Sequence, residues 1–128
     1  MKRLVIDLDG TLALDDPGLP YAERVPNLAL IEKLRAYKAQ GFAIAIHTAR
    51  NMRAHAGSIG LINAHTLPVV IEWLRRHAVP YDEIHVGKPW CGEDGFHVDD
   101  KAIRPAEFLG LTHAAITALL ARDAGRAG

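Results

Sequence analysis

The sequence MKRLVIDLDGTLA contains two aspartates separated by a single residue, Asp7 and Asp9, directly after an apolar run. One carboxylate in such a position can act as a nucleophile, and a second can serve as the acid and base that moves the proton. Gly10 and Thr11 follow, and the turn that they close can direct backbone N–H groups at an anion. These residues predict phosphoryl transfer through an aspartyl phosphate, with Asp7 as the nucleophile and Asp9 as the acid and base.

Three other strand-like segments also end in polar side chains that suit this chemistry. Thr48 follows FAIAIH and Lys88 follows EIHVG, so a hydroxyl donor and a fixed positive charge are available to hold a phosphate. An acidic pair, Asp99 and Asp100, follows GFHV. Because ligands of open α/β sheets bind at the carboxyl ends of the strands, we expect these residues to converge there with the first pair of aspartates.

Four carboxylates in one crevice repel one another and require a positive charge among them. Mg²⁺ prefers oxygen ligands and is usually held by one or two carboxylates together with a substrate phosphate. The predicted metal ligands are Asp7, Asp9, Asp99 and Asp100. If a strand continues through the last two, their side chains point to different sides, which leaves open which one touches the metal, with Asp100 slightly favoured.

Residues 49–65 form a long connection without firm periodicity, and such connections inside compact domains are usually functional. Arg50, two residues after Thr48, is predicted to bind the substrate phosphate, and the alternative is a surface ion pair. Arg53 and His55 supply further hydrogen-bond donors, which we expect to contact the leaving group of the substrate.

The hydrophobic pattern predicts strands and helices in alternation. Strands are expected at residues 4–8, 42–47, 83–87 and 95–98. Helices are expected to begin at Asn27, Thr66 and Thr112. The apolar faces predicted for the first two helices comprise Leu30, Ile31, Leu34, Tyr37, Val70, Trp73 and Leu74. This alternation predicts one domain over residues 1–128, an α/β fold built as a three-layer α/β/α sandwich around a mainly parallel sheet.

The composition narrows the class of protein further. Fifteen basic and fifteen acidic side chains leave no net charge, which argues against a protein that tracks along nucleic acid. The single cysteine, Cys91, excludes an intramolecular disulfide and a multi-cysteine zinc site, and it fits a reducing cytosol. The first apolar run is too short for a signal peptide or a membrane span, so we expect a cytoplasmic protein without membrane contact.

In their order and strand context, DLDGT, Thr48, Lys88 and the acidic pair resemble the four signature motifs of the haloacid dehalogenase (HAD) superfamily, over residues 4–105. The resemblance implies a HAD-like Rossmannoid fold and a metal ligand in the backbone carbonyl of Asp9. Dehalogenases of the superfamily lack the second aspartate of the first motif, and its P-type ATPases carry threonine there. Asp9 therefore indicates a phosphatase or a phosphomutase.

Phosphomutases of the superfamily generally carry a cap domain, and neither residues 12–26 nor residues 49–65 are long enough to form one. The sequence therefore resembles a capless HAD phosphatase with an open active site. Loops can cover such a site, as can a neighbouring subunit if the protein is a homo-oligomer.

More narrowly, HTARNMRAHAG, GLINAHTLPVVIEWL and VPYDEIHVGKPWCGEDGFHVDDKAIRPAEF resemble the small phosphatase-like proteins of bacterial capsular polysaccharide biosynthesis clusters. That resemblance implies a Mg²⁺-dependent hydrolase acting on a sugar phosphate. The heptose bisphosphate phosphatases, which are also capless, carry a zinc loop of cysteine and histidine, and a chain with only Cys91 departs from them.

Two other functions remain open on the sequence. The first is a nucleotide or polynucleotide 3′-phosphatase, although the neutral net charge counts against a polynucleotide substrate. The second is a non-catalytic phosphate-binding module. Asp9 counts against the second, because binding alone does not require a group that moves protons.

Overall fold

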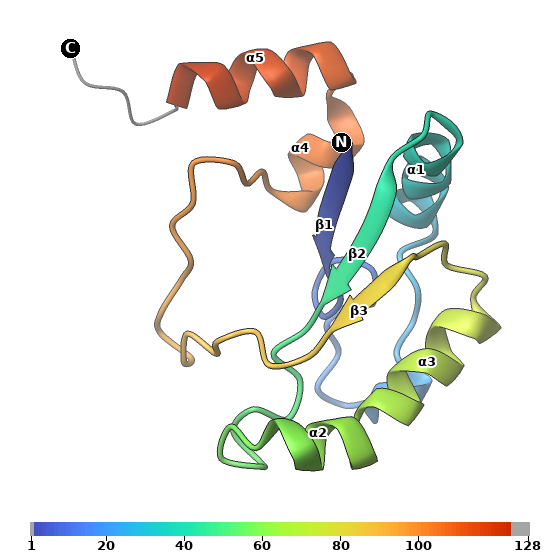
Figure 1. Cartoon of the computed structure of the whole chain (residues 1–128), viewed down its shortest axis with the longest axis vertical. Coiled ribbons are helices and arrows are strands. Elements are labelled where there is room, and N and C mark those ends of the chain that lie inside the picture. The colour runs from blue at the N-terminus through green and yellow to red at the C-terminus, as the bar shows by residue number, and fades with distance from the viewer. Residues whose placement is uncertain (1, 124–128) are drawn as a thin grey trace. The chain divides into compact units, whose positions relative to one another are not determined.

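The computed structural model describes residues 2–123 and contains one parallel sheet with helices (Figure 1). Its strands are β1 (Arg3–Asp7), β2 (Ala43–His47) and β3 (Glu83–His85), hydrogen-bonded in the order β1-β2-β3. The helical elements are η1 (Tyr21–Glu23, a 3₁₀ turn), α1 (Leu28–Ala39), α2 (Ile59–His65), α3 (Leu67–Arg76), α4 (Pro105–Gly110) and α5 (His113–Asp123). The predicted α/β class with a parallel sheet is confirmed.

The chain divides after Trp90 into two compact units. The first contains the sheet, η1, α1, α2 and α3, and the second contains α4 and α5. Residues 12–26 and 49–65, the segments considered as a cap, both belong to the first unit. In the described part of the chain, no helix is both long enough and apolar enough to cross a membrane.

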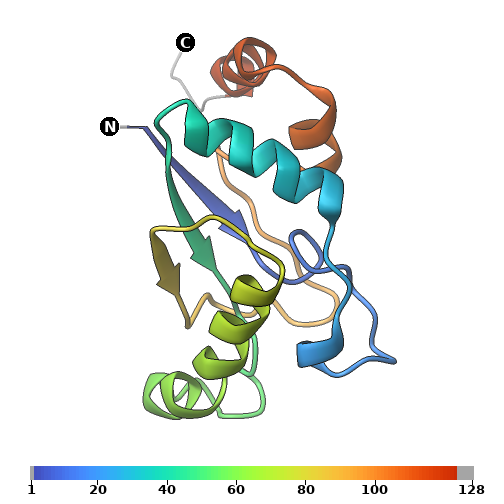
Figure 2. The same cartoon turned by 90° about the vertical axis from the view of Figure 1, so that its right-hand side faces the viewer.

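Helices α1 and α3 cover the same face of the sheet, as Figures 1 and 2 show from two sides. This follows from the strand order, because right-handed crossovers from β1 to β2 and from β2 to β3 place both connecting helices on one side. The predicted apolar faces are the ones buried there: Leu30, Ile31, Leu34, Tyr37, Val70, Trp73 and Leu74. Two of the three expected layers are thus formed within residues 2–90.

Helix starts follow the predicted caps in two of three cases. The Asn27 side chain accepts a hydrogen bond from the Leu30 N–H at 3.3 Å, and the Thr112 hydroxyl accepts one from the Ala115 N–H at 3.1 Å. Thr66 does not cap α3, because its own backbone is helical and its hydroxyl donates to another residue. Helix α2 therefore runs almost directly into α3.

The connection after β2 is more ordered than the sequence pattern indicates. Residues 59–65, expected to lack regular structure, form α2, which starts where the Ser58 hydroxyl accepts from the Leu61 N–H at 3.3 Å. Seven residues make only two turns, too few for an apolar period to stand out in the sequence. The short helix α4 was missed for the same reason.

The fourth strand predicted at residues 95–98 is wrong: in the described residues no strand follows β3. Phe96 and Val98 alternate with polar residues as in a strand, yet both side chains are exposed. Alternation alone does not make a strand, because the backbone N–H and C=O groups also need a neighbouring edge to bond with.

Asp82 fastens the start of β3 to β2 and to α1. Its backbone N–H donates to the Ile44 carbonyl and its carboxylate accepts from the Ile44 N–H, both at 2.8 Å. Lys38 of α1 donates to both carboxylate oxygens at 2.7 Å. The hydrogen bond from Lys38, followed by that from Ile44, lowers the pKa of Asp82 below its ordinary value.

A carboxyl whose pKa is lowered on folding stabilises the protein above the unfolded pKa, here about pH 4, and loses that contribution as the pH falls below it. We therefore expect Asp82→Asn to lower the melting temperature at pH 7 and to lower it progressively less below pH 4. Thermal unfolding from pH 3 to pH 7 measures this difference. In a Lys38→Met background the effect of Asp82→Asn at pH 7 should shrink, and an unchanged effect would contradict the pairing.

Candidate active site

Backbone hydrogen bonds join the three strands just beyond their carboxyl ends. The Leu8 N–H donates to the His47 carbonyl at 3.2 Å, and the Thr48 N–H donates to the His85 carbonyl at 3.0 Å. The Lys88 N–H in turn donates to the Thr48 carbonyl at 3.1 Å. Of the residues predicted to converge, Asp7, Asp9, Thr48 and Lys88 gather at this edge, and Arg50 joins them through its contact with Asp9.

Asp7 and Lys88 form the first ion pair of the site. The Lys88 Nζ lies 3.3 Å from Asp7 Oδ1, although the two residues are 81 positions apart in the chain. Both side chains are partly exposed, at 31% for Asp7 and 19% for Lys88. A carboxylate and an ammonium group that solvent still reaches can contact an incoming phosphate ester.

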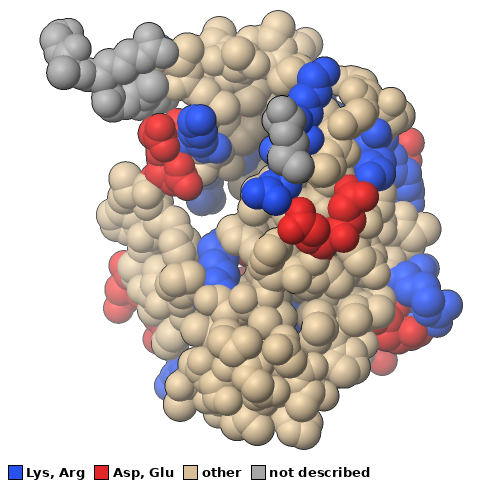
Figure 3. Space-filling view, in the orientation of Figure 1, with Lys and Arg blue, Asp and Glu red and all other residues tan. Residues whose placement is uncertain are grey.

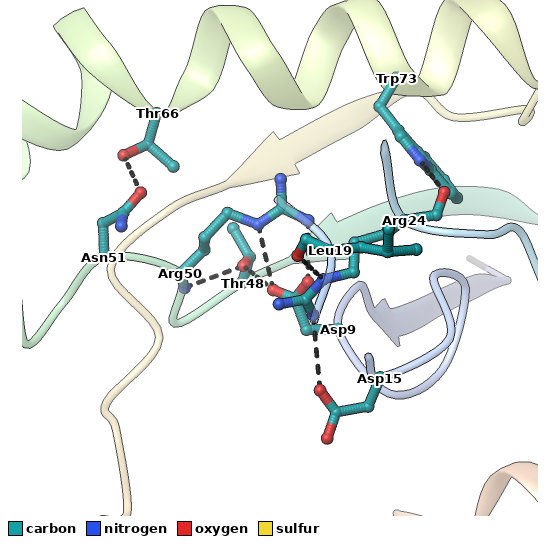
Figure 4. A network of polar contacts seen from close by, with 9 residues as sticks. All are labelled: Asp9, Asp15, Leu19, Arg24, Thr48, Arg50, Asn51, Thr66 and Trp73. Atoms are coloured by element: carbon teal, nitrogen blue, oxygen red, sulfur yellow. Dashed lines mark hydrogen bonds and ion pairs between the residues drawn. The ribbon is translucent and has the colours of Figure 1, made fainter. Parts of the chain in front are cut away.

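Asp9 is the centre of a denser set of contacts, shown in Figure 4. Arg50 donates to both of its carboxylate oxygens, from Nη2 at 2.8 Å and from Nε at 3.2 Å. The Thr48 hydroxyl lies 3.3 Å from Asp9 Oδ2 and accepts a hydrogen bond from the Arg50 N–H at 3.0 Å. Asp9 is thus held by a bidentate guanidinium pair and a hydroxyl.

The two ion pairs balance the charges of the site. Asp7 faces Lys88 and Asp9 faces Arg50, so two carboxylates and two cationic groups occupy the sheet edge. The sequence predicted a cation among the acidic residues and proposed a metal ion for that role. Within the first unit, side chains of the protein already supply two positive charges.

Two backbone N–H groups of the turn after β1 form hydrogen bonds within the turn. The Gly10 N–H donates to the Ala13 carbonyl at 2.8 Å, and the Thr11 N–H donates to the Leu8 carbonyl at 3.4 Å. These two amides therefore bond within the turn, and the direction of other backbone N–H groups of the turn at a bound anion stays a prediction. A tight turn satisfies its internal donors first, because unpaired backbone N–H groups are costly.

Arg50 differs from the surface ion pair that was the alternative to its predicted substrate role. Its side chain is only 1% exposed, so it is not part of a surface ion pair, and its guanidinium is engaged with Asp9 rather than open to substrate. Thr48 is buried as well, and its hydroxyl is occupied within the same network. Direct contact of these two residues with a substrate phosphate stays a prediction.

Sequence reasoning missed Tyr21, and it did not predict the contact between Asn51 and Thr66, which it had considered only as a loop donor and a helix cap. The Arg50 guanidinium carbon lies 4.1 Å from the centre of the Tyr21 ring. Asn51 has a left-handed backbone, with φ of 62°, and its side chain accepts a hydrogen bond from the Thr66 hydroxyl at 2.7 Å. The Asn51 and Thr66 contact, visible in Figure 4, fixes the chain just after Arg50. Nothing in the spacing of these residues indicates such contacts.

The loop residues expected to touch a leaving group lie near other rings. The Arg53 guanidinium carbon is 5.6 Å from the centre of a Trp90 ring, and the His55 and His65 ring centres are 6.0 Å apart. Trp90 is half exposed, at 47%. The part played by this group in substrate selection stays a prediction.

Asp99 and Asp100 belong to the second unit and are exposed there. The Asp99 carboxylate accepts a hydrogen bond from the Lys101 N–H at 2.8 Å, which closes a local turn. Their assignment as metal ligands, and the choice between them, stay predictions.

The donor set at the sheet edge fits a magnesium ion that is bound together with a substrate. Among residues 2–123 no three His, Cys, Asp or Glu side chains gather as a closed metal site. Mg²⁺ does not need one, since one or two carboxylates, water and substrate phosphates usually complete its shell. Asp7 supplies one carboxylate at this edge, and the backbone carbonyl of Asp9 is the second oxygen ligand that the resemblance implies.

The fold and the site together define an α/β protein with an Asp–Lys and an Asp–Arg pair at the carboxyl edge of a parallel sheet. No protein-family model matches the chain, and no curated protein matches it. A crystal structure of a structural-genomics target from Vibrio cholerae is similar along almost the whole chain, with a TM-score of 0.92 and 52% sequence identity, covering 96% of this chain and 99% of that one. The chain belongs to the same family as this Vibrio cholerae protein.

More distant structures resemble the fold. A chain of the Pnkp1/Rnl/Hen1 complex is similar with a TM-score of 0.52 and 23% identity, over 86% of this chain and 34% of that one. The D,D-heptose 1,7-bisphosphate phosphatase from B. bronchiseptica, crystallised with magnesium and phosphate, has a TM-score of 0.48 and 17% identity over 75% and 54% of the two chains. The first likeness concerns the fold alone, and the second supports no inference.

Proposed function

We propose that this protein is a phosphatase of the HAD type that hydrolyses a small phosphomonoester through an aspartyl phosphate. The observation that carries the proposal is the pair of carboxylates at one sheet edge, each beside a cationic side chain. A partly exposed Asp7 with Lys88 at 3.3 Å offers a nucleophile next to a charge that attracts phosphate. Asp9, two residues on, offers the group that moves protons.

The reaction proceeds in two displacements. In the first, an Asp7 carboxylate oxygen attacks phosphorus, the bond from phosphorus to the ester oxygen breaks, and protonated Asp9 gives its proton to that leaving oxygen. In the second, a water molecule attacks the phosphorus of the acyl phosphate while Asp9 takes a proton from that water. The bond from phosphorus to the Asp7 oxygen then breaks. One ester and one water thus yield one alcohol and one inorganic phosphate, and both aspartates return to their starting forms.

Lys88 would hold the phosphoryl oxygens in both displacements, because its ammonium group is already beside the nucleophile. The Asp7 carboxylate and the Asp9 carbonyl would hold a Mg²⁺ ion, and Asp99 and Asp100 stay the further ligands that the sequence predicts. When bound, that ion would neutralise charge on the phosphate.

The substrate class that we propose is a sugar phosphate, with a role in capsular or surface polysaccharide biosynthesis. The proposal rests on the resemblance of three long segments of the sequence to the phosphatase-like proteins of capsule clusters. A half-exposed Trp90 and the donors of the 49–65 loop are suited to a small polar leaving group.

A polynucleotide substrate is less well supported. Binding a long phosphate backbone needs a continuous basic surface, whereas the chain has no net charge. On the face shown in Figure 3, basic and acidic side chains are interspersed rather than separated into a basic track. A nucleotide monophosphate remains the alternative small substrate.

A phosphate-release screen across sugar phosphates, nucleotides and phosphosugar acids, with Mg²⁺ present, tests the proposal. We expect hydrolysis of at least one sugar phosphate, a loss of at least about 100-fold in rate on chelation, and recovery when Mg²⁺ is returned. Full turnover in excess chelator would overturn the metal requirement. No phosphate release from any class would favour the non-catalytic phosphate-binding module.

A further inference from the structure

We infer that Arg50 and Tyr21 act as a clamp that positions Asp9, so that Arg50 serves the proton-moving residue rather than the substrate phosphate. The inference rests on the proposed phosphatase function and adds two positioning residues to it. Arg50 acts through Asp9, and Tyr21 acts through Arg50.

The geometry of the contact between Arg50 and Asp9 is directional. Two nitrogens of one planar guanidinium bond to the two oxygens of one carboxylate, at 2.8 and 3.2 Å. Such a fork fixes both the position and the plane of the carboxyl group, which a single point charge does not do. Proton transfer to a leaving oxygen, or from water, depends on that orientation.

The burial of Arg50 distinguishes it from a residue that contacts substrate directly. Its side chain is 1% exposed, while that of Asp9 is 27% exposed, so of the two only Asp9 is open to an incoming molecule. The Arg50 Nη1 is buried with no hydrogen-bond partner in the described part of the chain. Keeping a buried cation with an unsatisfied donor is costly, and a residue needed only for packing could be replaced by an apolar one.

Tyr21 supplies the other side of the clamp. Its ring centre lies 4.1 Å from the Arg50 guanidinium carbon and 4.7 Å from that of Arg24, so it stacks against both cations. Contact with the ring restricts the orientation of the Arg50 guanidinium. The two hydrogen bonds from the guanidinium then restrict the orientation of the Asp9 carboxylate. The hydroxyl group of Tyr21 plays no part in this contact, which uses the face of the ring.

Helix α3 binds the turn that carries Tyr21 through two hydrogen bonds. The Trp73 indole N–H donates to the Arg24 carbonyl at 2.8 Å, and Arg76 donates to the Ala22 carbonyl at 2.8 Å. Figure 4 shows the contact from α3 to Arg24 beside the network around Asp9. The backbone on the carboxyl side of Tyr21 is therefore fastened to the core of the first unit, since Trp73 is buried.

The test compares kinetics for Arg50→Met, Arg50→Lys, Tyr21→Leu and Tyr21→Phe with the best substrate of the screen. We expect Arg50→Met to lower kcat about 10- to 100-fold with the inhibition constant of inorganic phosphate unchanged, and Arg50→Lys to restore part of the loss. Tyr21→Leu should lower kcat about fivefold. Tyr21→Phe keeps the ring and should restore most of the activity that Tyr21→Leu loses. Lys88→Met, as the comparison for a phosphate-holding residue, should weaken inhibition by phosphate.

The decisive arm places Arg50→Met in an Asp9→Asn background. If Arg50 acts through Asp9, the second change adds less than about a twofold loss, whereas damage to the fold would lower both backgrounds alike. Weakened phosphate inhibition, or a full additional loss, would overturn the clamp and return Arg50 to the substrate phosphate. A wild type that releases no phosphate overturns the proposed function, and the clamp with it, whereas an active wild type with additive losses overturns the clamp alone.

Discussion

Replacing Asp7 with asparagine is expected to lower the rate of phosphate release by at least about 10⁴-fold. Asparagine keeps the size of the side chain but removes the nucleophilic oxygen, so no acyl phosphate can form. The measurement is steady-state phosphate release with Mg²⁺. In parallel, mass spectrometry of enzyme quenched in acid during turnover should detect a phosphoryl adduct on the wild type and none on the variant.

Stability provides the control for Asp7→Asn. The Asp7 and Lys88 pair is partly exposed, so its loss should change the free energy of unfolding by no more than about 1 kcal/mol. A folded variant that is inactive supports the nucleophile. If the folded variant kept a tenth of the wild-type rate, Asp7 would not be the group that attacks phosphorus.

Asp9→Asn is expected to act in a different way, depending on the leaving group. An alkyl phosphate needs a proton on its leaving oxygen, so its hydrolysis should fall about 10²- to 10⁴-fold. The leaving group of p-nitrophenyl phosphate needs no proton, so activity on that ester should fall considerably less. The ratio of the two kcat/KM values, compared between variant and wild type, measures the effect. Equal losses on both esters would contradict the role of Asp9 as the acid.

The structure adds a second expectation for Asp9→Asn that Asp7→Asn does not share. Asp9 is the carboxylate partner of the buried Arg50, so its neutralisation leaves a buried cation without a counter-charge. The free energy of unfolding should fall by about 1 to 3 kcal/mol. Denaturant unfolding measures this, and the kinetics of the variant belong at a temperature well below its melting point. A decrease in the free energy of unfolding that is no larger for Asp9→Asn than for Asp7→Asn would contradict the buried ion pair of Asp9 and Arg50.

The fold was predictable from sequence where two independent signals in the same segment agree. Helix α1 has both a capping residue, Asn27, and an apolar face with helical spacing, so its existence and its buried side were both predicted. The first two strands are short apolar runs typical of a covered parallel sheet. The segment at residues 95–98 has comparable strand-like residues but no partner edge in the described structure, and its prediction failed.

The site was likewise predictable only in part. Asp7, Thr48 and Lys88 were expected together because each follows a strand, and strand direction alone brings their backbones to one edge of a parallel sheet. What each side chain contacts was not accessible from spacing. The amides of Gly10 and Thr11, for example, bond within the turn that these residues close.

By itself, the sequence determined that three strands alternate with the helices α1 and α3, which face each of these two helices buries, and that Asp7, Thr48 and Lys88 reach the carboxyl edge of the sheet. These depend on periodicity and strand direction, which are properties of the chain read a few residues at a time. Only the tertiary structure decided that Arg50 turns away from solvent to hold Asp9, with Tyr21 stacked against it. That choice depends on how Arg50 meets Asp9, 41 residues away in the chain, and Tyr21, 29 residues away (50 − 21). Burying Arg50 requires a counter-charge close by, and Asp9 supplies it.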